Sequence, residues 1–412
     1  MDEATNAPFI STGCCIAGGG PAGLVLGYLL ARSGIPVTVL EKHADFLRDF
    51  RGDTIHPSTL RALSELALLD DFLKLPHQQA GHVQAEVAGG IFNVASFGHL
   101  DPRWNFVAFM PQWDFLNFLA ERASVFPHFR LLMQTAVVSL IEENGWVAGV
   151  HAIGPKGNID IRAQLVIGCD GRHSTVRDAC GLSPKQLGAP MDVLWFSLSR
   201  QESDGVDPVG KFEAGRVFIR INRGVQWQCG YVIAKGSLES IHAAGLDAFR
   251  ASVAEASPVL ADRVDEIIDW DYVKLLSVAV DRLERWHKPG VLLIGDAAHT
   301  MSPVGGVGIN LAIQDAIAAS NILSDPLRRG LVDESDLARV QKRREWPTRV
   351  TQKMQIIAQN NVIRPVLSGQ SMQPPIFLRI LNAIPWLQRI PAWMIGTGVR
   401  PEHVWTQELP PV

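Results

Sequence analysis

Three short apolar segments along the chain each end in a cluster of glycine and polar residues. These segments are residues 14–17, 165–168 and 291–294. An apolar segment of this length that ends in small or polar residues is typical of a buried strand followed by a loop. Helical spacing follows the loops, over 24–33 in the first case and from about 310 in the last. The pattern therefore predicts an α/β fold built from strand–loop–helix units.

The remaining hydrophobic pattern divides the chain into further elements. Apolar positions at helical spacing predict helices over 57–72 and 113–123. Between 188 and 284 the pattern changes to short strands separated by glycine, asparagine and aspartate turns, with one helix over 246–261. These strands are expected over 193–198, 216–221 and 226–234. We therefore expect a second domain that is built on a β-sheet.

The elements predict one discontinuous domain, an inserted second domain and a tail. The discontinuous domain takes residues 8–80, 100–187 and 285–365, and the second domain takes 81–99 and 188–284. The tail, 366–412, consists of short apolar pieces punctuated by proline. Such a tail either lies on a membrane surface or packs as helices over a cavity or a dimer surface. Because the tail carries few Lys or Arg residues, packing is favoured over membrane contact.

The first loop has the glycine spacing of a dinucleotide fingerprint. Gly18, Gly20 and Gly23 occupy the first, third and sixth positions of the motif, between the first strand and the first helix. The first glycine permits a tight turn, the second lets the backbone reach a pyrophosphate, and the third lets the helix pack on the strand. Glu41 ends the next strand, where a carboxylate binds ribose hydroxyls. An acid at this position favours FAD or NAD over a 2′-phosphorylated nucleotide.

Two further motifs follow the second and third apolar segments. Asp170-Gly171 is followed by Ser174 and Arg177, again where a strand end enters a helix. The third loop is Gly-Asp-Ala-Ala-His at 295–299, followed by a proline and by Gly-x-Gly-x-Asn at 306–310. A glycine-rich loop lets backbone amides approach a phosphate or an electron-rich ring without interference from side chains. The aspartate at the strand end can accept hydrogen bonds from a polyol.

Composition excludes several classes of protein. The chain has 412 residues, 47% of them hydrophobic and 19% charged, which fits two globular domains rather than a disordered chain. Its net charge of -4 gives no electrostatic case for nucleic-acid binding, so the basic cluster 342–344 is expected on a solvated helix face. The five cysteines lack metal-ligand spacing and are expected to be reduced. An acidic flank precedes the first apolar stretch, so we expect no signal peptide and a cytoplasmic protein.

With these three motifs in this order, the chain resembles the flavin monooxygenases of the p-hydroxybenzoate hydroxylase type, the group A aromatic hydroxylases. That family combines a glycine-rich FAD fingerprint, an Asp-Gly motif with a downstream Ser and Arg, and a late Gly-Asp motif with Pro and Gly-x-Gly-x-Asn. The resemblance covers roughly residues 10–365. It implies a Rossmann-like FAD-binding domain with an inserted β-sheet substrate domain and a C-terminal helical tail.

The resemblance also assigns residues to the cofactor. The residues that would hold the ADP half of FAD are Gly18, Gly20, Pro21, Ala22, Gly23, Glu41 and Lys42. Val137 matches the position whose backbone meets the adenine, and Gln112 matches a contact of the ribityl or pyrophosphate region. Asp296 matches the aspartate that binds the ribityl hydroxyls, and Asp170 has a mixed structural and binding role. The residues expected along the flavin ring are Arg51, Pro303, Gly306, Gly308, Ile309 and Asn310.

Three residues are candidates for the chemistry itself. Arg51 matches the arginine near the flavin, and Pro303 would lie beside the ring where the reaction occurs. His56 is an addition to the family pattern, and it is either catalytic or a lone histidine that precedes a helix. His299 is expected to shape the loop rather than exchange protons. Arg177 is equally compatible with binding a ligand and with pairing to a nearby carboxylate.

The resemblance implies an FAD-dependent monooxygenase that uses NADPH or NADH and O2 to hydroxylate a small aromatic substrate through a flavin C4a-hydroperoxide. The substrate would be phenolic, aminoaromatic or polyketide-like, and the enzyme a monomer or a homodimer. Candidate pocket walls, each also compatible with ordinary core, are Trp195, Phe218, Trp227 and Val278. Three alternatives stay open: a flavin-dependent reductase, a halogenase, whose Trp-x-Trp-x-Ile-Pro signature this chain lacks, and a non-catalytic flavoprotein.

Overall fold

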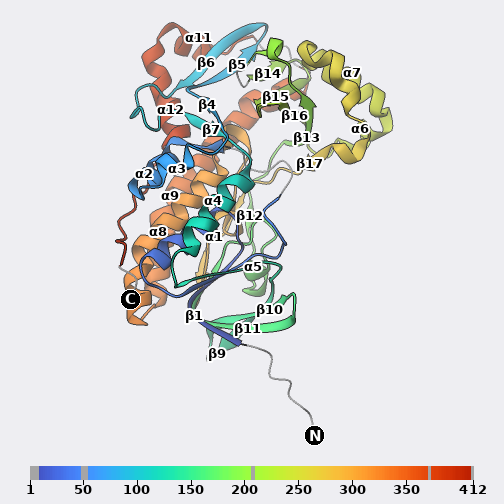
Figure 1. Ribbon diagram of the computed structural model, residues 1–412. Helices are drawn as coiled ribbons and strands as arrows, with labels where there is room; N and C mark the ends of the chain where they lie inside the picture. The colour runs from blue at the N-terminus through green and yellow to red at the C-terminus, as the bar shows by residue number, and fades with distance from the viewer. Residues whose placement is uncertain (1–8, 48–53, 206–208, 370–372, 410–412) are drawn as a thin grey trace.

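Two sheets lie at opposite ends of an elongated molecule (Figure 1). The computed structural model describes residues 9–47, 54–205, 209–369 and 373–409. The long helices α8 (Gly308–Arg329) and α9 (Glu334–Ala358) run from one sheet towards the other (Figure 1). The predicted α/β fold is confirmed.

The first sheet provides the strand ends on which the three motifs lie. Its main path is β19 (His287–Lys288), β20 (Val291–Leu293), β11 (Gly157–Gly168), β1 (Phe9–Ala17), β2 (Val37–Leu40) and β8 (Phe129–Leu132). The strands from β20 to β8 along this path run parallel. Helices α1 (Pro21–Arg32) and α4 (Gln112–Ser124) pack beside it. Residues 14–17 and 291–293 are buried, as expected for parallel strands that are covered on both faces.

The second sheet has two different buried faces. Its order is β17 (Lys274–Leu276), β13 (Met191–Ser199), β16 (Gln226–Ala234), β15 (Arg216–Asn222), β14 (Val209–Glu213), β5 (His82–Val87) and β6 (Gly90–Ser96). One face packs with Phe249 and Val253 of α7 (Leu246–Ala256), next to α6 (Leu238–Ala244). The other face packs with Val366 of α10 (Arg364–Leu367) and with Val304, so it meets the third predicted loop.

Two predicted helices are shorter than the hydrophobic pattern suggested. The helix predicted over 57–72 is divided into α2 (Pro57–Glu65) and α3 (Leu69–Phe72). Ala67 lies between them with a φ of 57°, a left-handed conformation that ends an α-helix. The helix predicted over 246–261 ends at Ala256, because Pro258 begins a 3₁₀ segment (Pro258–Glu266).

The tail packs one of its sides on the second sheet. α11 (Ile376–Ala383) and α12 (Arg389–Gly396), joined by a 3₁₀ turn (Pro385–Gln388), lie against β6. Leu378 and Ala392 are buried in this contact. The chain then returns to α1, where the Leu409 N–H donates to the Arg32 carbonyl at 3.0 Å. In the described part of the chain, no helix is long and apolar enough to cross a membrane.

Buried charges join α8 to α9, and they correct one prediction. Arg344, expected on a solvated face, has no exposed surface. Its Nε donates to Asp315 Oδ1 at 2.9 Å, and its Nη1 donates to Glu402 Oε1 at 3.1 Å. Burial opposes the charge on Asp315, but His299 and Arg344 outweigh burial and hold the pKa of Asp315 below its usual range. The expectation failed because both carboxylates come from other segments, which helical spacing within α9 does not reveal.

Replacing Arg344 with methionine would leave Asp315 and Glu402 buried without their shared cation. We expect the free energy of unfolding, measured by urea denaturation, to fall by about 3 kcal/mol. The matched control is Arg339→Met, because Arg339 is exposed on the same helix and pairs with Asp336 at 2.9 Å. Removing such a surface pair costs less than about 1 kcal/mol. Equal losses in the two variants would contradict the importance of the buried pair.

Candidate functional site

The three predicted motifs meet at the carboxyl ends of neighbouring parallel strands. β1, β11 and β20 are adjacent in the first sheet, and one motif follows each strand. The loops are in direct contact: a β-carbon on Gly18 would lie 2.4 Å from the Cys169 carbonyl oxygen. A β-carbon on Gly295 would lie 3.7 Å from the β-carbon of Ala22. The carboxyl edge of an open parallel sheet is where ligands bind in this class of fold.

The fingerprint glycines form a cradle at the amino end of α1. Gly18 has a φ of 105°, and a β-carbon on Gly23 would lie 2.0 Å from the Gly18 carbonyl oxygen, so both positions require glycine. A β-carbon on Gly20 would meet no atom within 4 Å, so the outer side of the cradle is open. Pro21 and Ala22 begin the helix, whose free N–H groups and positive dipole end favour an anion. The cradle therefore fits the pyrophosphate of FAD.

Glu41 lies beside this cradle, immediately after β2. Its carboxylate accepts hydrogen bonds from the Gly19 and His43 N–H groups, each at 3.0 Å. The Thr135 N–H donates to the Glu41 carbonyl at 2.9 Å, which brings the segment that leads to Val137 next to Glu41. Glu41 and Val137 must lie close together if both are to contact the ADP half of FAD.

For Lys42 and Gln112, two other residues predicted to bind the cofactor, the described part of the structure shows no hydrogen bond to the α1 cradle. Lys42 is exposed to solvent. Gln112 begins α4, shortly after β7 (Val107–Phe109), which pairs with β3 (Thr54–Ile55). Gln112 is therefore connected through β7 to the strand that leads to His56.

Asp170 is engaged within its own loop. Its carboxylate accepts hydrogen bonds from the Ser174 hydroxyl at 2.5 Å and from the Val176 N–H at 3.0 Å. Burial raises the pKa of Asp170, and these hydrogen bonds act in the opposite direction. Arg177 is buried, and its Nε pairs with Asp178 Oδ1 at 3.2 Å, which is compatible with the predicted pairing to a nearby carboxylate.

The third loop, residues 295–310, is held by the segment that leads into α2. The Asn310 side chain accepts hydrogen bonds from the His56 N–H at 3.0 Å and the Thr59 hydroxyl at 2.7 Å, and it donates to the Thr54 carbonyl at 3.2 Å. The Gly306 carbonyl accepts a hydrogen bond from the Thr54 hydroxyl at 3.0 Å. Because the Asn310 side chain is used within the protein, any contact of Asn310 with a cofactor would come from its backbone.

The third loop ends at the amino end of α8, which carries backbone donors. Gly308 begins this helix of 22 residues and is followed by Ile309 and Asn310. The first N–H groups of an α-helix have no partner within the helix and carry the positive end of its dipole. They are suited to the electron-rich edge of a flavin ring. Asp296 lies at the other end of the loop, half-buried in a 3₁₀ turn (Gly295–Ala297).

A buried glutamine of α9 holds both sides of Pro303, and the sequence pattern did not predict it. Gln355 Oε1 accepts a hydrogen bond from the Ser302 N–H at 3.1 Å. Gln355 Nε2 donates to the Ser302 carbonyl at 2.8 Å and to the Val304 carbonyl at 2.9 Å. A single side-chain amide thus pairs with the loop backbone as a neighbouring strand would. Pro303 is fixed between the two residues that Gln355 binds.

Two more buried glutamines extend this contact along α9. Gln352 Nε2 donates to the Thr300 carbonyl at 3.0 Å, and Gln359 Nε2 donates to the Ser302 hydroxyl at 2.6 Å. Gln359 begins a π-helical turn (Gln359–Ile363), a feature that is frequent at functional sites. The spacing of the three glutamines puts them on one helix face, which is a signal in the sequence. It is a weak signal, because glutamine is common on solvated helix faces.

His56 is buried and neutral. It is 1% exposed, and its Nδ1 lies 2.7 Å from the Ile395 carbonyl oxygen, so the tautomer with the proton on Nδ1 makes this hydrogen bond. Burial lowers the pKa of His56 to about 4, although the hydrogen bond to Ile395 opposes the shift. His56 directly precedes α2, in agreement with the second of its two predicted roles. Arg51 lies outside the described residues.

His299 connects the third loop to the buried charges. Its Nε2 lies 2.6 Å from Asp315 Oδ2, and the Gly295 N–H donates to the same oxygen at 3.2 Å. The Trp286 ring packs against the imidazole with a centroid separation of 4.8 Å. These contacts are compatible with the predicted loop-shaping role of His299.

The four predicted pocket residues divide between the two faces of the second sheet. Trp195 and Val278 lie on the face that meets Val304 of the third loop. Phe218 and Trp227 lie on the opposite face, packed with α7. Because neighbouring residues of a strand point to opposite faces, Phe218 and Trp227 belong to a separate core. Only Trp195 and Val278 remain candidates for a pocket wall beside the loop.

Replacing Gln355 with leucine would remove the partner of three backbone groups beside Pro303. We expect the dissociation constant for FAD, measured from flavin fluorescence, to rise about tenfold, which corresponds to about 1.4 kcal/mol. Gln355→Glu would place a carboxylate oxygen against the Ser302 and Val304 carbonyls, so we expect at least as large a rise as in Q355L. The control is Lys353→Ala, because Lys353 is exposed on the same helix. Unchanged FAD affinity in Q355L, with native circular dichroism, would show that the loop does not depend on this amide.

The buried His56 should make stability depend on pH. Its folded pKa of about 4 lies below the unfolded value, so the unfolded chain binds the proton more readily. This contribution is fully present above about pH 6.5 and is lost as the pH falls toward about 4. By about pH 5 the parent chain should lose about 2 kcal/mol relative to neutral pH. His56→Gln, compared by urea denaturation at both pH values, should lack this component, and an equal loss in both chains would contradict it.

Comparison with known proteins agrees with this geometry. A family model described as "FAD binding domain" matches residues 11–354. The 6-methylpretetramide 4-monooxygenase of Streptomyces rimosus is 34% identical over 350 residues, which cover 84% of this chain and 83% of that protein. The rifampicin monooxygenase of Streptomyces venezuelae is 30% identical over 314 residues, which cover 73% of this chain but only 61% of that protein.

Solved structures show the same fold. The p-nitrophenol 4-monooxygenase PnpA of Pseudomonas putida DLL-E4 aligns with a TM-score of 0.79 at 20% identity, over 95% of this chain and 100% of that one. PqsL of Pseudomonas aeruginosa, titled a probable FAD-dependent monooxygenase, aligns with a TM-score of 0.74 at 19% identity, over 87% of this chain and 98% of that one. The family model covers most of the chain and includes all three motifs of the cradle and loops. The chain therefore belongs to the FAD-binding-domain family, as an FAD-dependent monooxygenase with the p-hydroxybenzoate hydroxylase-like fold.

Proposed function

We propose that this monooxygenase hydroxylates a polycyclic aromatic substrate of the polyketide type, with NADPH or NADH as reductant and O2 as the source of oxygen. The substrate class is supported by relatives whose names include 6-methylpretetramide and anhydrotetracycline. The apolar face of the second sheet beside the third loop supports a binding site for a flat apolar molecule.

The proposal rests mainly on Trp195. Its Nε1 is buried and has no hydrogen-bond partner among the described residues. A buried donor without a partner is rare and costs free energy. The indole ring lies over Gly230, where a β-carbon would come within 2.9 Å of the ring. An oxygen atom of the substrate would accept from Nε1, while the substrate rings pack near Val278 and Val304.

The residues of this chain would bind and orient the reactants rather than react themselves. When bound, FAD would supply the reduction by NAD(P)H and the activation of O2. The α1 cradle would hold the pyrophosphate, and the amino end of α8 would hold the ring edge. Gln355 would keep Pro303 beside the ring, and the apolar cluster around Val304 would exclude water. His56 would stay neutral near pH 7, and its role would be to hold Asn310 and the Ile395 carbonyl in place.

We also propose a reducing, cytoplasmic setting. The five cysteines are all unpaired, and four of them are buried. Free cysteines of this kind are typical of reducing compartments. The active unit would be a monomer or a homodimer.

The direct test is to incubate the purified yellow protein with phenols, aminoaromatics and polycyclic polyketides. We expect a polycyclic compound to accelerate NAD(P)H oxidation, to stimulate O2 uptake and to gain one oxygen atom by mass. Saturation of a double bond without O2 uptake would identify a reductase instead. Halide incorporation would identify a halogenase. If no compound of these three classes gains oxygen, the proposed substrate class is wrong.

The role of Trp195 is tested with the substrate found in this way. Trp195→Phe removes the N–H and keeps an aromatic ring, so we expect kcat/KM to fall about tenfold, mainly through KM, with unchanged FAD content. The control is Trp227→Phe, because Trp227 lies on the opposite face and its Nε1 donates to Asp204 at 2.9 Å. A similar KM in both variants would contradict the assignment of Trp195.

A further inference from the structure

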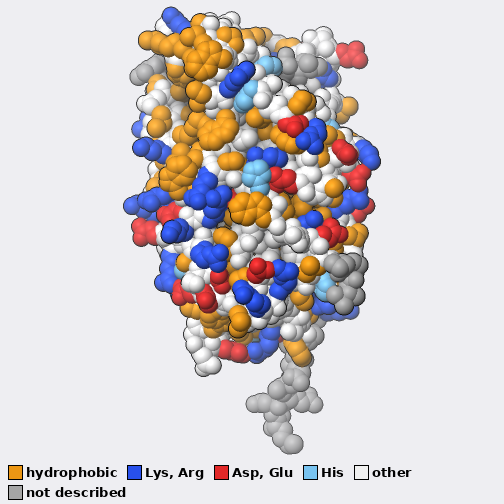
Figure 2. All heavy atoms as spheres, turned by 90° about the vertical axis from the view of Figure 1, so that its left-hand side faces the viewer, with side chains coloured by type: hydrophobic (Ala, Val, Ile, Leu, Met, Phe, Trp, Pro, Cys, Tyr) orange, Lys and Arg blue, Asp and Glu red, His pale blue; other side chains and the backbone are white. Residues whose placement is uncertain are grey.

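The outer side of the tail is an exposed apolar surface. Its members, which we call the tail face, are 40% to 75% exposed and are Ile376, Phe377, Ile380, Ile384, Trp386, Ile390 and Trp393. Apolar side chains gather at one end of the molecule in the space-filling view (Figure 2). The inner side of the same helices is buried on the second sheet through Leu378 and Ala392. A contiguous apolar face of this kind on a folded protein marks an interaction site.

The charged side chains in the stretch of sequence that contains the tail face have one sign. From residue 346 to residue 401 the sequence contains no Asp or Glu. Over the same stretch it contains six basic residues: Arg349, Lys353, Arg364, Arg379, Arg389 and Arg400. Arg379 and Arg389 lie within the tail face and are exposed, and neither guanidinium has an ion pair among the described residues. The tail carries few basic residues, which in the sequence favoured packing over membrane contact, but the exposed side of its helices is both apolar and cationic.

This charge pattern favours one occupant. A second copy bound face to face would bring the same arginines together, and the stretch 346–401 has no carboxylate to neutralise them. A bilayer with anionic lipids supplies the opposite charge and an apolar layer below it. Trp and Phe beside Arg are the side chains that lie at the boundary between headgroups and acyl chains.

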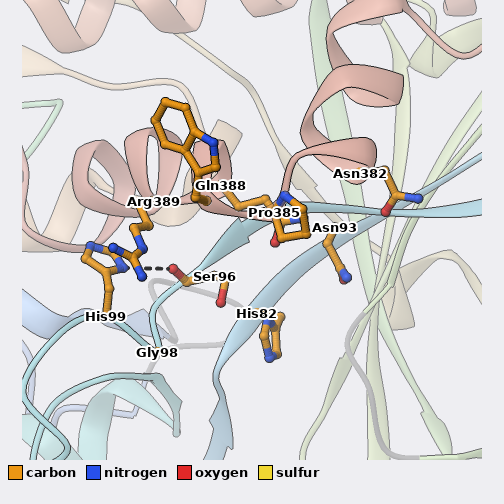
Figure 3. Close-up of a pocket in the computed structure, with 10 residues that line it drawn as sticks. His82, Asn93, Ser96, Gly98, His99, Asn382, Pro385, Gln388 and Arg389 are labelled. Atoms are coloured by element: carbon orange, nitrogen blue, oxygen red, sulfur yellow. Dashed lines mark hydrogen bonds between the residues drawn. The ribbon is translucent and has the colours of Figure 1, made fainter.

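A hollow with both polar and apolar side chains in its wall lies at the base of the tail face. A cavity of about 440 Å³ separates the 3₁₀ turn and α12 from β5 and β6 (Figure 3). Arg389 and His99 lie at one end of it, and Asn93 and Asn382 lie at the other (Figure 3). Trp386 of the tail face is also part of its wall. A guanidinium with an imidazole at the same end of the hollow is suited to a phosphate group.

We propose that the tail face docks on a bilayer that contains anionic phospholipids, and that one headgroup phosphate enters this hollow beside Arg389. α12 also reaches the candidate site, since the Ile395 carbonyl accepts the hydrogen bond of His56 at 2.7 Å. Docking therefore holds the monooxygenase site one helix away from the lipid surface. The proposal does not depend on which substrate is hydroxylated.

The test is flotation of the full FAD-loaded chain with vesicles. We expect binding to mixed phosphatidylcholine and phosphatidylglycerol vesicles, with weaker binding to phosphatidylcholine alone and at high salt. Trp386→Ser combined with Trp393→Ser should weaken binding at least about tenfold. The matched control is Trp405→Ser, because Trp405 is 74% exposed but lies outside the tail face. Circular dichroism and FAD content should be unchanged in all variants.

The headgroup site has a separate test. Arg389→Gln should reduce the preference for phosphatidylglycerol by about fivefold, the effect of one cation at a charged bilayer. An unchanged preference would overturn the headgroup site. Absence of vesicle binding, or equal binding by the double tryptophan variant, would overturn the docking surface. A concentration-dependent dimer that is lost in the double variant, without vesicle binding, would assign the tail face to a second copy and also overturn the proposal.

Discussion

The parallel pairing of β20, β11 and β1 is the constraint on which the candidate site depends. Each strand is buried along its final residues, and each ends at the same edge of the sheet. Burial of these apolar strands favours a sheet that is covered on both faces, and their parallel pairing brings the three strand ends to one edge. Three loops that are far apart in the sequence therefore meet around one ligand position. The glycines at that edge keep it open and let the loops touch.

An edge built from glycine-rich loops cannot hold its own shape, because glycine loses the most conformational freedom on folding. The third loop is instead held by side chains from both sides. Asn310 binds the segment 54–59, and Gln352, Gln355 and Gln359 bind residues 300–304. Buried backbone groups need partners, and here amide side chains supply them in place of a neighbouring strand. These contacts within the protein hold the residues on both sides of Pro303, and such support is what a pre-organised site requires.

The hydrophobic pattern predicted most of the local secondary structure, but it did not predict the tertiary contacts of individual side chains. It predicted the strands that carry the motifs, but it did not reveal the left-handed residue Ala67, which divides one expected helix in two. It treated Phe218 and Trp227 as equivalent to Trp195, although the sheet turns them to opposite faces. Arg344 was expected on a solvated face, and Gln352, Gln355 and Gln359 were not singled out at all. Their partners come from other segments, so helical spacing within α9 contains no information about them.

The sequence by itself determined the order of the elements, the three glycine-rich motifs and, through them, the family and its cofactor. These features are local, because a glycine that permits a turn or a close approach acts on its immediate neighbours. Only the tertiary structure decided which side of the second sheet faces the third loop, which polar residues of α9 are buried, and which side of the tail is left exposed. Those properties depend on contacts between distant segments, and burial exists only once the segments have packed together.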